Sequence, residues 1–217
     1  MAVVTVPLPP SGCWVHPSVT VRRSPVEGLG LFSADALSLG TVVLRLGGQL
    51  VSDEDLRARL ATAAADPAQT YVDTITVDNL HLVIPSGDPV HYGNHSCDPN
   101  LWYVDPYSFS ARRDIEPGEE LTSDYATTTG VPDWEMDCLC GSVTCRRRVT
   151  GEDWCLPELQ RRYGGHWTPG LRRLTVGDSC RSDAESFRGN VSGAARVSTE
   201  TSAADHLADG RRGSADG

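Results

Sequence analysis

Three cysteines lie close together in the segment Cys138-Leu-Cys140-Gly-Ser-Val-Thr-Cys145. The spacing C-x-C-x4-C lets three thiolates reach one tetrahedral zinc ion, provided that a fourth ligand comes from elsewhere in the chain. The alternative is a loop with free thiols, or a redox pair formed by two of the three. We favour zinc, with Cys97 as the fourth ligand and with Cys155 and His166 as nearby rivals.

A second motif pairs two glycines, in Glu27-Gly28-Leu29-Gly30. Glycine lets backbone N–H and C=O groups approach a ligand without interference from a side chain. The motif lacks the third glycine and the long following helix of a dinucleotide fingerprint, which disfavours phosphate binding. Taken alone, it is more typical of a Gly-rich hairpin turn than of a ligand site.

A third segment, residues 115–125, has a turn at Pro117-Gly118 followed by an alternating stretch that ends at Tyr125. A strand-terminal tyrosine is ordinarily a half-buried amphipathic residue, so this segment alone does not indicate a catalyst.

The order of the motifs is more informative. The paired glycines, the loop Asn94-His-Ser-Cys-Asp-Pro-Asn100, the Tyr125 segment and the cysteine cluster follow one another along the chain. In this order they resemble the SET-domain protein lysine methyltransferases that carry a post-SET zinc motif, over about residues 15–160.

The resemblance implies a mainly β fold, in which small β-sheets surround a knot-like crossing, with few short helices and a zinc-bound post-SET segment. In that crossing, the strand that carries Tyr125 threads beside the 94–100 loop. We expect an N-terminal extension at residues 1–14, the SET domain at 15–130, and the post-SET segment with a short helix at 131–175. Few apolar residues follow, so residues 176–217 are predicted to form a disordered tail.

The resemblance also implies S-adenosylmethionine as the methyl donor and a structural zinc ion. Tyr125 takes the place of the family's catalytic tyrosine, and Tyr71 matches, in a looser motif, a second tyrosine that hydrogen-bonds the substrate amine. The residues implied in cofactor binding are Gly28, Leu29, Gly30, Asn94, His95, Tyr125 and, over the adenine, Trp154. The implied zinc ligands are Cys97, Cys138, Cys140 and Cys145.

Two positions depart from the family pattern. The residue two before the tyrosine is usually Phe or Tyr and governs how many methyl groups fit, whereas here it is Ser123. The smaller side chain leaves more room, which predicts a di- or trimethylated product. His91-Tyr92-Gly93 stands where relatives more often have an Arg-aromatic-Ile run, and His91 taken alone is a polar surface residue.

The expected reaction is methyl transfer to the side-chain amine of a lysine in a protein or peptide. Transfer from a sulfonium needs no metal and no covalent intermediate, so positioning of an unprotonated amine supplies most of the acceleration. The lysine pKa is about 10.4 in water, and an apolar, aromatic-walled channel must lower it by desolvation. The alternatives are a zinc-stabilised SET-like module that binds a peptide without transfer, and a methyltransferase that acts on a small-molecule amine.

Composition is consistent with one main domain and a cationic substrate. The 217 residues include 29 acidic and 19 basic side chains, all of the latter Arg, for a formal charge of -10. Residues 1–137 alone carry 7 Arg against 19 acidic residues, a net of -12, which attracts a basic peptide. The balance argues against a cationic nucleic-acid binder. Seven cysteines cannot all be paired within one chain.

Short apolar runs rich in β-branched and aromatic residues predict strands at 18–22, 29–32, 41–46, 71–77, 80–84, 101–104 and 107–111. Ser52 can cap a helix over residues 53–65, whose first turn is acidic, and Pro157 favours a short helix over 156–162. The chain shows neither a secretion signal nor an apolar stretch of membrane-spanning length. We therefore expect a monomer in the bacterial cytoplasm, or in the nucleus of a eukaryote, with no membrane or nucleic-acid partner.

Overall fold

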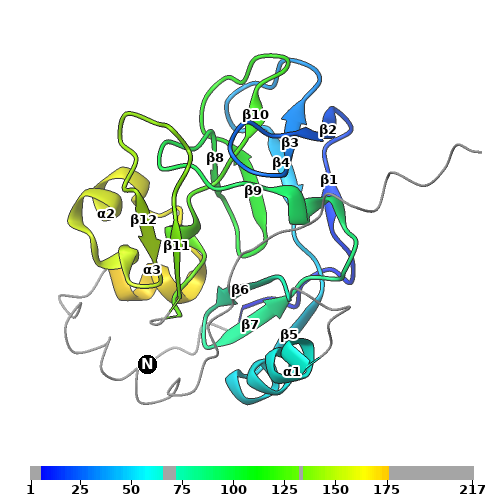
Figure 1. The fold of residues 1–217 in the computed structure, drawn as a ribbon, viewed down its shortest axis with the longest axis vertical. Coiled ribbons are helices and arrows are strands. Elements are labelled where there is room, and N and C mark those ends of the chain that lie inside the picture. Colours follow the sequence, from blue (N-terminus) through cyan, green and yellow to red (C-terminus); the bar gives the residue numbers. More distant parts are fainter. Residues whose placement is uncertain (1–5, 66–71, 132–133, 176–217) are drawn as a thin grey trace, which may run out of the picture.

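The computed structural model describes residues 6–65, 72–131 and 134–175. In these residues, short strands form four small antiparallel sheets, accompanied by short helices (Figure 1). The expectation of a mainly β fold with few helices is confirmed. None of the helices in the described part of the chain is long and apolar enough to cross a membrane.

Two sheets lie around the center of the molecule. The larger one has the strand order β1-β4-β9-β8, formed by β1 (Trp14–Val15), β4 (Val42–Arg45), β9 (Ser108–Ala111) and β8 (Leu101–Tyr103). The other has the order β10-β3-β2, formed by β10 (Glu120–Leu121), β3 (Leu29–Ser33) and β2 (Val19–Arg23). Because β3 pairs with β10, the strand that contains Gly30 lies beside the strand that leads to Tyr125.

Two further sheets lie at the periphery (Figure 1). One has the order β5-β7-β6, with β5 (Gln49–Val51), β7 (Leu80–Val83) and β6 (Thr74–Val77). It packs beside α1 (Asp53–Ala65), whose N-terminus is stabilised by Ser52 because the Oγ atom accepts a hydrogen bond from the Asp55 N–H at 3.1 Å. The other is a two-stranded ribbon of β11 (Glu135–Asp137) and β12 (Arg148–Thr150).

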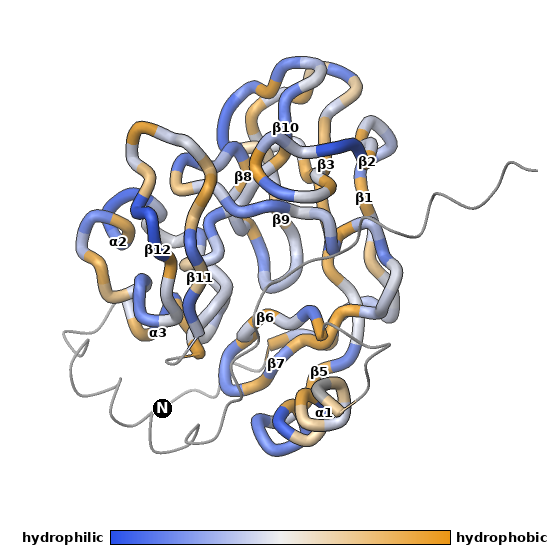
Figure 2. Tube along the Cα trace, in the orientation of Figure 1, coloured by the Kyte–Doolittle hydropathy of each residue, from blue (hydrophilic) through white to orange (hydrophobic). Residues whose placement is uncertain are grey.

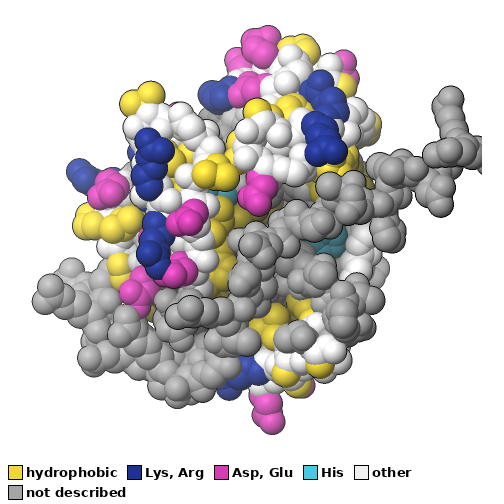
Figure 3. All heavy atoms as spheres, viewed as in Figure 1, with side chains coloured by type: hydrophobic (Ala, Val, Ile, Leu, Met, Phe, Trp, Pro, Cys, Tyr) yellow, Lys and Arg dark blue, Asp and Glu magenta, His cyan; other side chains and the backbone are white. Residues whose placement is uncertain are grey.

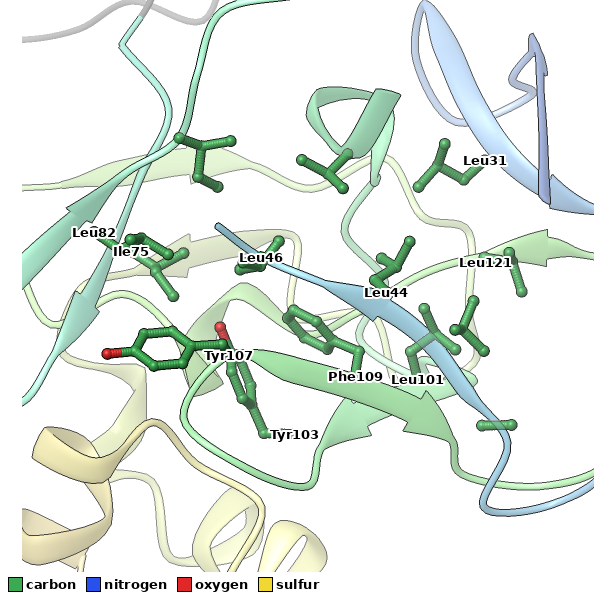
Figure 4. Packing of buried hydrophobic residues seen from close by; sticks show 14 of the residues in the cluster. Leu31, Leu44, Leu46, Ile75, Leu82, Leu101, Tyr103, Tyr107, Phe109 and Leu121 are labelled. Atoms are coloured by element: carbon green, nitrogen blue, oxygen red, sulfur yellow. The ribbon is translucent and has the colours of Figure 1, made fainter. Parts of the chain in front are cut away.

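The three larger sheets share one hydrophobic core. Its buried side chains come from β3, β4, β6, β7, β8, β9 and β10, from η1 (Pro89–Tyr92) and from the adjoining loops, and β6 and β7 each contain hydrophobic stretches, drawn orange in Figure 2. Aromatic rings fill the space beside β4, where Tyr103 and Phe109 lie 4.1 Å apart between ring centroids (Figure 4). Burial of this apolar surface is the main favourable term that holds the sheets together.

The C-terminal part, residues 134–175, packs around a smaller apolar cluster. It comprises the ribbon, the 3-10 turn η3 (Asp153–Cys155), and the helices α2 (Pro157–Tyr163) and α3 (Pro169–Thr175). Two further 3-10 turns lie next to the sequence motifs: η1 (Pro89–Tyr92) precedes the 94–100 loop, and η2 (Tyr125–Thr127) follows β10.

The sequence predicts most of these elements. The seven expected strand segments coincide with β2, β3, β4, β6, β7, β8 and β9, and the two expected helices coincide with α1 and α2. Strand β6 begins at Thr74, later than the expected start at residue 71, which lies outside the described residues together with the expected tail at 176–217. The strand expected after Pro117-Gly118 is β10, but it ends at Leu121, and Tyr125 begins a 3-10 turn instead of ending the strand. The sequence does not predict the strands β1, β5, β11 and β12 or the helix α3.

Candidate active site and cysteine cluster

The loop at 94–100 and the segment before Tyr125 lie side by side. His95 and Ser123 form an isolated parallel bridge. The Ser96 N–H donates to the Ser123 carbonyl at 3.0 Å, and the Ser123 N–H donates to the Asn94 carbonyl at 3.2 Å. This pairing joins residues far apart in the sequence and is the adjacency that the expected crossing requires.

Tyr125 begins η2 directly after this pairing and is held at both ends. Its hydroxyl donates to the Gly93 carbonyl at 2.8 Å, and its backbone N–H donates to Nδ1 of His95 at 3.2 Å. The rings of Tyr125 and His95 lie 5.3 Å apart. Because burial raises the pKa of Tyr125 above its ordinary value, the hydroxyl stays protonated and remains a donor.

His95 is buried and uncharged. Burial lowers the pKa of His95 to about 4, despite the opposing field of the Asp124 carboxylate 3.6 Å away, so this approach is not an ion pair at neutral pH. Since Nδ1 accepts from Tyr125, the ring proton resides on Nε2, which lies 3.3 Å from Sγ of Cys97. One imidazole ring thus connects Tyr125 to the cysteine cluster.

Asn94 joins the loop to the paired glycines. Its amide nitrogen lies 3.0 Å from the Leu29 carbonyl and 2.8 Å from Oε1 of Glu120. Gly28 has a φ of 52°, which favours glycine, and a side chain at Gly30 would clash with the Glu120 carboxylate. The structure therefore brings Gly28, Leu29, Gly30, Asn94, His95 and Tyr125 into one region.

Four cysteines form a compact cluster. The Sγ atoms of Cys97, Cys138, Cys140 and Cys145 all lie within 4.8 Å of one another. Those of Cys97 and Cys138 are 3.7 Å apart, and a tetrahedral zinc with Zn–S bonds of about 2.3 Å would place its sulfurs about 3.8 Å apart. The donor set and its spacing therefore fit zinc.

Backbone donors surround these sulfurs. The Arg146 N–H donates to Sγ of Cys97 at 3.3 Å, and the Arg147 N–H donates to Sγ of Cys145 at 3.4 Å. Burial raises the pKa of Cys97 to about 11, so a bound cation would be needed to keep this sulfur as a thiolate at neutral pH. Such N–H groups stabilise metal-bound thiolates from outside the ligand set.

The rival ligands lie elsewhere. The ring of His166 stacks on that of Trp102, with centroids 3.5 Å apart and planes 5° apart. Cys155 packs at the edge of the C-terminal apolar cluster. Of the three candidates for a fourth ligand, the structure brings only Cys97 to the other three cysteines.

Two aromatic residues predicted for the site, Trp154 and Tyr71, stay predictions. Trp154 is buried with α2 and α3 in the C-terminal apolar cluster, and its role over an adenine stays a prediction. Tyr71 lies outside the described residues.

Sequence reasoning missed Trp134, whose ring lies 6.3 Å from that of Tyr125. The available signal was an aromatic residue between Tyr125 and the first cysteine of the cluster.

Sequence reasoning also missed a buried ion-pair network. Asp124 has 1 % of its surface exposed, yet its carboxylate receives two hydrogen bonds of 2.7 Å from Arg146. The Tyr163 hydroxyl donates a third, at 2.8 Å. Although burial opposes ionisation, the hydrogen bonds from Arg146 hold the pKa of Asp124 below its ordinary value. Asp124 lies within the 115–125 segment and Arg146 follows Cys145, but the pairing could not be inferred from the sequence.

A cleft of about 900 Å³ is lined by residues of α1, of the end of β7 and of η1. Asp73, Asp88, His91 and Tyr92 are among the residues that line it. His91 is not a free surface residue, because its two ring nitrogens lie 2.8 Å from Oδ2 of Asp73 and 2.6 Å from the Pro85 carbonyl. The hydrogen bond to Asp73 raises the pKa of His91.

Comparisons with known proteins identify the family. The model of the SET domain matches residues 28–126, which include the paired glycines, the 94–100 loop and Tyr125. The chain is 30% identical over 173 residues to the methyltransferase flvH of Aspergillus flavus, covering 76% of this chain and 86% of that protein. The chain belongs to the SET-domain methyltransferase family.

Other members of this family resemble the chain over a smaller part of their length. It is 28% identical over 170 residues to the histone-lysine N-methyltransferase ash1 of Drosophila melanogaster, covering 72% of this chain and 8% of ash1. For the human histone-lysine N-methyltransferase 2D, the identity is 29% over 137 residues, covering 60% of this chain and 2% of that protein. The methyltransferase domain of human SETMAR matches with a TM-score of 0.48 and 20% identity, covering 62% of this chain and 57% of that one.

Proposed function

We propose that this SET-domain protein transfers methyl groups from S-adenosylmethionine to the side-chain amine of a lysine in a protein substrate. The observation that supports the proposal most directly is the position of Tyr125. Its hydroxyl is fixed on the Gly93 carbonyl, beside His95 and the Asn94 side chain that contacts the paired glycines.

The groups available for the cofactor suit a cation. The Leu29 carbonyl, the Glu120 carboxylate and the Gly93 carbonyl are acceptors, and the uncharged His95 adds no positive charge. S-adenosylmethionine carries a sulfonium and an ammonium group, and when bound it supplies an electrophilic methyl group. Gly28, Leu29, Gly30 and Asn94 would hold it, with Tyr125 at the reacting end.

The residues of the chain then act by positioning. The Tyr125 hydroxyl and the Gly93 carbonyl are fixed to each other before any substrate binds, so they can orient the amine without reorganisation during transfer. The partial burial of both groups favours the neutral form of a lysine amine, which is the form that reacts. Tyr71, which lies outside the described residues, is proposed as the second tyrosine at the amine.

The cleft beside η1 offers two carboxylates to a basic substrate, next to Arg59 and His91. Asp73 and Asp88 line it, and the Gly93 carbonyl that holds Tyr125 follows directly after the lining residue Tyr92. Opposite charge on a peptide would steer it to this face. The relatives ash1 and 2D are named as histone-lysine methyltransferases, which is consistent with a protein substrate.

We further propose that Cys97, Cys138, Cys140 and Cys145 hold one structural zinc ion, and that residues 15–130 form the SET domain with 131–175 as its post-SET segment. The clustering of the four sulfurs supports both statements, because the cluster joins the 94–100 loop to the ribbon of β11 and β12. Trp134 is added to the proposed site as an aromatic neighbour of Tyr125.

A small-molecule amine is the second candidate substrate. The chain covers 86% of flvH, whose name specifies a methyltransferase and no histone. The two substrates are distinguished by incubating the protein with labelled S-adenosylmethionine and either a lysate of the source cell or a set of free amines. Label in protein bands identified by mass spectrometry supports the proposal, and label confined to free amines supports the second candidate. The chain itself contains no Lys, so methyl-lysine cannot arise from its own side chains.

Titration with S-adenosylhomocysteine and one matched pair of variants test the assignment of Tyr125. Tyr125→Phe removes the hydroxyl bonded to Gly93, and we expect the transfer rate to fall by about 100-fold, as for other preorganised donors. Tyr107→Phe is the control, since its hydroxyl also donates to a backbone carbonyl, that of Pro7 at 2.6 Å. Equal rates in both variants would contradict the role of Tyr125. A protein that binds the ligand yet transfers nothing to any substrate would instead be a binding module.

Ser123 is proposed to leave room for more than one methyl group. It lies two residues before Tyr125 and pairs with the loop through its backbone alone, in hydrogen bonds to Asn94 and Ser96. Its short side chain can therefore be enlarged without loss of that pairing. Intact-mass analysis should show di- or trimethylated product, and Ser123→Tyr should shift the product toward one methyl. Monomethyl product from both proteins would contradict this proposal.

A further inference from the structure

Arg146 forms a second connection, besides that of His95, between the cysteine cluster and the segment that contains Tyr125. It follows Cys145 directly, and its backbone N–H donates to Sγ of Cys97 at 3.3 Å. Its guanidinium points the other way and donates to both carboxylate oxygens of Asp124, each at 2.7 Å. A third donor, Nε, reaches Oδ2 of Asp153 at 2.9 Å. One residue thus contacts a proposed zinc ligand and the residue before Tyr125.

Asp124 fixes the turn that carries Tyr125. Its carboxylate accepts from the Ala126 N–H at 3.0 Å, which stabilises the first turn of η2. Together with two donors of Arg146 and the Tyr163 hydroxyl, this gives the carboxylate four hydrogen bonds. None of these donors belongs to a cysteine. Any effect of Asp124 on the cysteine cluster must therefore pass through another residue.

The pairing is of the kind that locks a conformation. A planar guanidinium matches a carboxylate in two parallel hydrogen bonds, a geometry that a lysine cannot reproduce. The side chain of Asp124 is 0% exposed and that of Arg146 is 13% exposed, so water cannot replace a lost partner. If Arg146 is removed, the buried Asp124 carboxylate loses its cationic partner. If Asp124 is removed, Arg146 loses two hydrogen bonds and keeps Asp153 as a carboxylate partner.

We propose that Arg146 is a positioning residue that couples the cysteine cluster to the turn bearing Tyr125. Order in the cluster fixes the backbone of Arg146, and the guanidinium fixes Asp124 and hence η2. The coupling is reciprocal, because a change at one end must alter the other by the same free energy. The catalytic consequence rests on the proposed function, whereas the coupling between Asp124 and the cysteines does not.

The test is a double-mutant cycle on zinc release. The folded zinc-loaded protein is mixed with a chromophoric chelator, well below its melting temperature, and the rate of release is measured for the wild type, Asp124→Asn, Arg146→Met and the double variant. We expect each single change to speed release by roughly 10- to 100-fold, which is typical for residues that support metal ligands. We expect the double variant to release zinc no faster than the faster single variant.

Arg148→Met is the matched control. Arg148 lies two residues further along the chain and pairs with Glu135 at the surface, so its loss should leave zinc release unchanged. Arg146→Lys keeps the positive charge but cannot form the two parallel hydrogen bonds of a guanidinium. We expect its rate of zinc release to lie between those of the wild type and Arg146→Met. A chain that holds no zinc, an Asp124→Asn variant that releases zinc at the wild-type rate, or rate effects that multiply in the double variant would each overturn the coupling.

A second measurement separates this inference from the proposed function. In the same variants, the methyl-transfer rate is divided by the concentration of protein that binds S-adenosylhomocysteine. We expect this rate to fall while the KM for S-adenosylmethionine changes little. The reason is that Asp124 and Arg146 contact neither the paired glycines nor the Asn94 amide. If the wild type transfers no methyl group but the zinc-release cycle behaves as expected, the proposed function fails and the coupling stands. Normal transfer rates in Arg146→Met would overturn the positioning role.

Discussion

The sheet body, residues 6–131, and the C-terminal segment, residues 134–175, are held together by different forces. Among the residues that the structure describes, the main cluster of the sheet body contains seventeen buried hydrophobic side chains. The corresponding cluster beside the C-terminal segment contains six, and one of these, Ala126, belongs to the sheet body. The sheet body thus has a core of its own, and the C-terminal segment has a small one.

The C-terminal segment compensates with polar links to the sheet body. Cys97 comes from the sheet body and the other three cysteines come from the segment. The same holds for the pair of Asp124 and Arg146, which is buried, whereas the segment's own pair of Arg148 and Glu135 is at the surface. Basic and acidic side chains lie next to one another on the face of the C-terminal segment seen in Figure 3. The comparison indicates that order in the segment depends on these links and that the sheet body folds largely by hydrophobic burial.

Removal of the proposed zinc should have the largest effect. Structural zinc in small zinc-finger peptides contributes about 10–16 kcal/mol of apparent binding free energy, and this energy is also folding energy. We expect chelation or Cys138→Ser to abolish protection from hydrogen exchange in residues 134–175, while β4, β7 and β9 of the sheet body stay protected. Cys13→Ser, outside the cluster, should leave both regions protected. Loss of protection throughout the chain would contradict the division into two regions.

A pair of leucine truncations should have the next largest effect. Leu82 lies in the main cluster with 0% exposure and Leu159 lies in the C-terminal cluster with 1% exposure. Truncation of a buried leucine to alanine costs about 2–5 kcal/mol. We expect Leu82→Ala to lower the free energy of unfolding of the sheet body in urea with little change in zinc release. Leu159→Ala should instead speed zinc release and exchange in residues 134–175. Identical profiles from the two variants would show that the molecule unfolds as one unit.

The same contrast explains how far the sequence predicts the structure. In the sheet body, short runs of apolar, β-branched or aromatic residues mark β2, β3, β4 and β6 to β9, because hydrophobic burial leaves its pattern in the local sequence. In the C-terminal segment, β11 has the sequence Glu-Met-Asp and α3 has Gly170 in its first turn, and these residues are not typical of their elements. These elements form because of contacts made far away in the chain.

The candidate site divides in a similar way. Motif residues such as Gly28, Asn94 and Cys97 could be named in advance, because their residue types and order limit what they can do. The contact of Trp134 with Tyr125 and the pairing of Arg146 with Asp124 could not. Each depends on a three-dimensional approach between ordinary residue types that leaves no spacing in the sequence.

The smallest expected effect is a pH dependence confined to the sheet body. His91 lies on η1, and its hydrogen bond to Asp73 raises its pKa above the unfolded value of about 6.5. A raised pKa means that the folded state binds the proton more tightly. The stabilisation is therefore fully present below about pH 6.5 and is lost as the pH rises through the pKa of the folded protein.

His91→Gln isolates this contribution. The wild type should lose stability toward urea between pH 6 and pH 8, by less than either leucine truncation costs, and His91→Gln should lose less over the same range. The network of Asp124 and Arg146 does not titrate there, since the pKa of Asp124 is lowered and that of Arg146 is raised. Hydrogen exchange in residues 134–175, once corrected for the intrinsic pH dependence of amide exchange, should accordingly stay constant from pH 6 to 8. The same pH dependence in wild type and His91→Gln would place its source outside η1, and a change limited to residues 134–175 would reverse the contrast between the two regions.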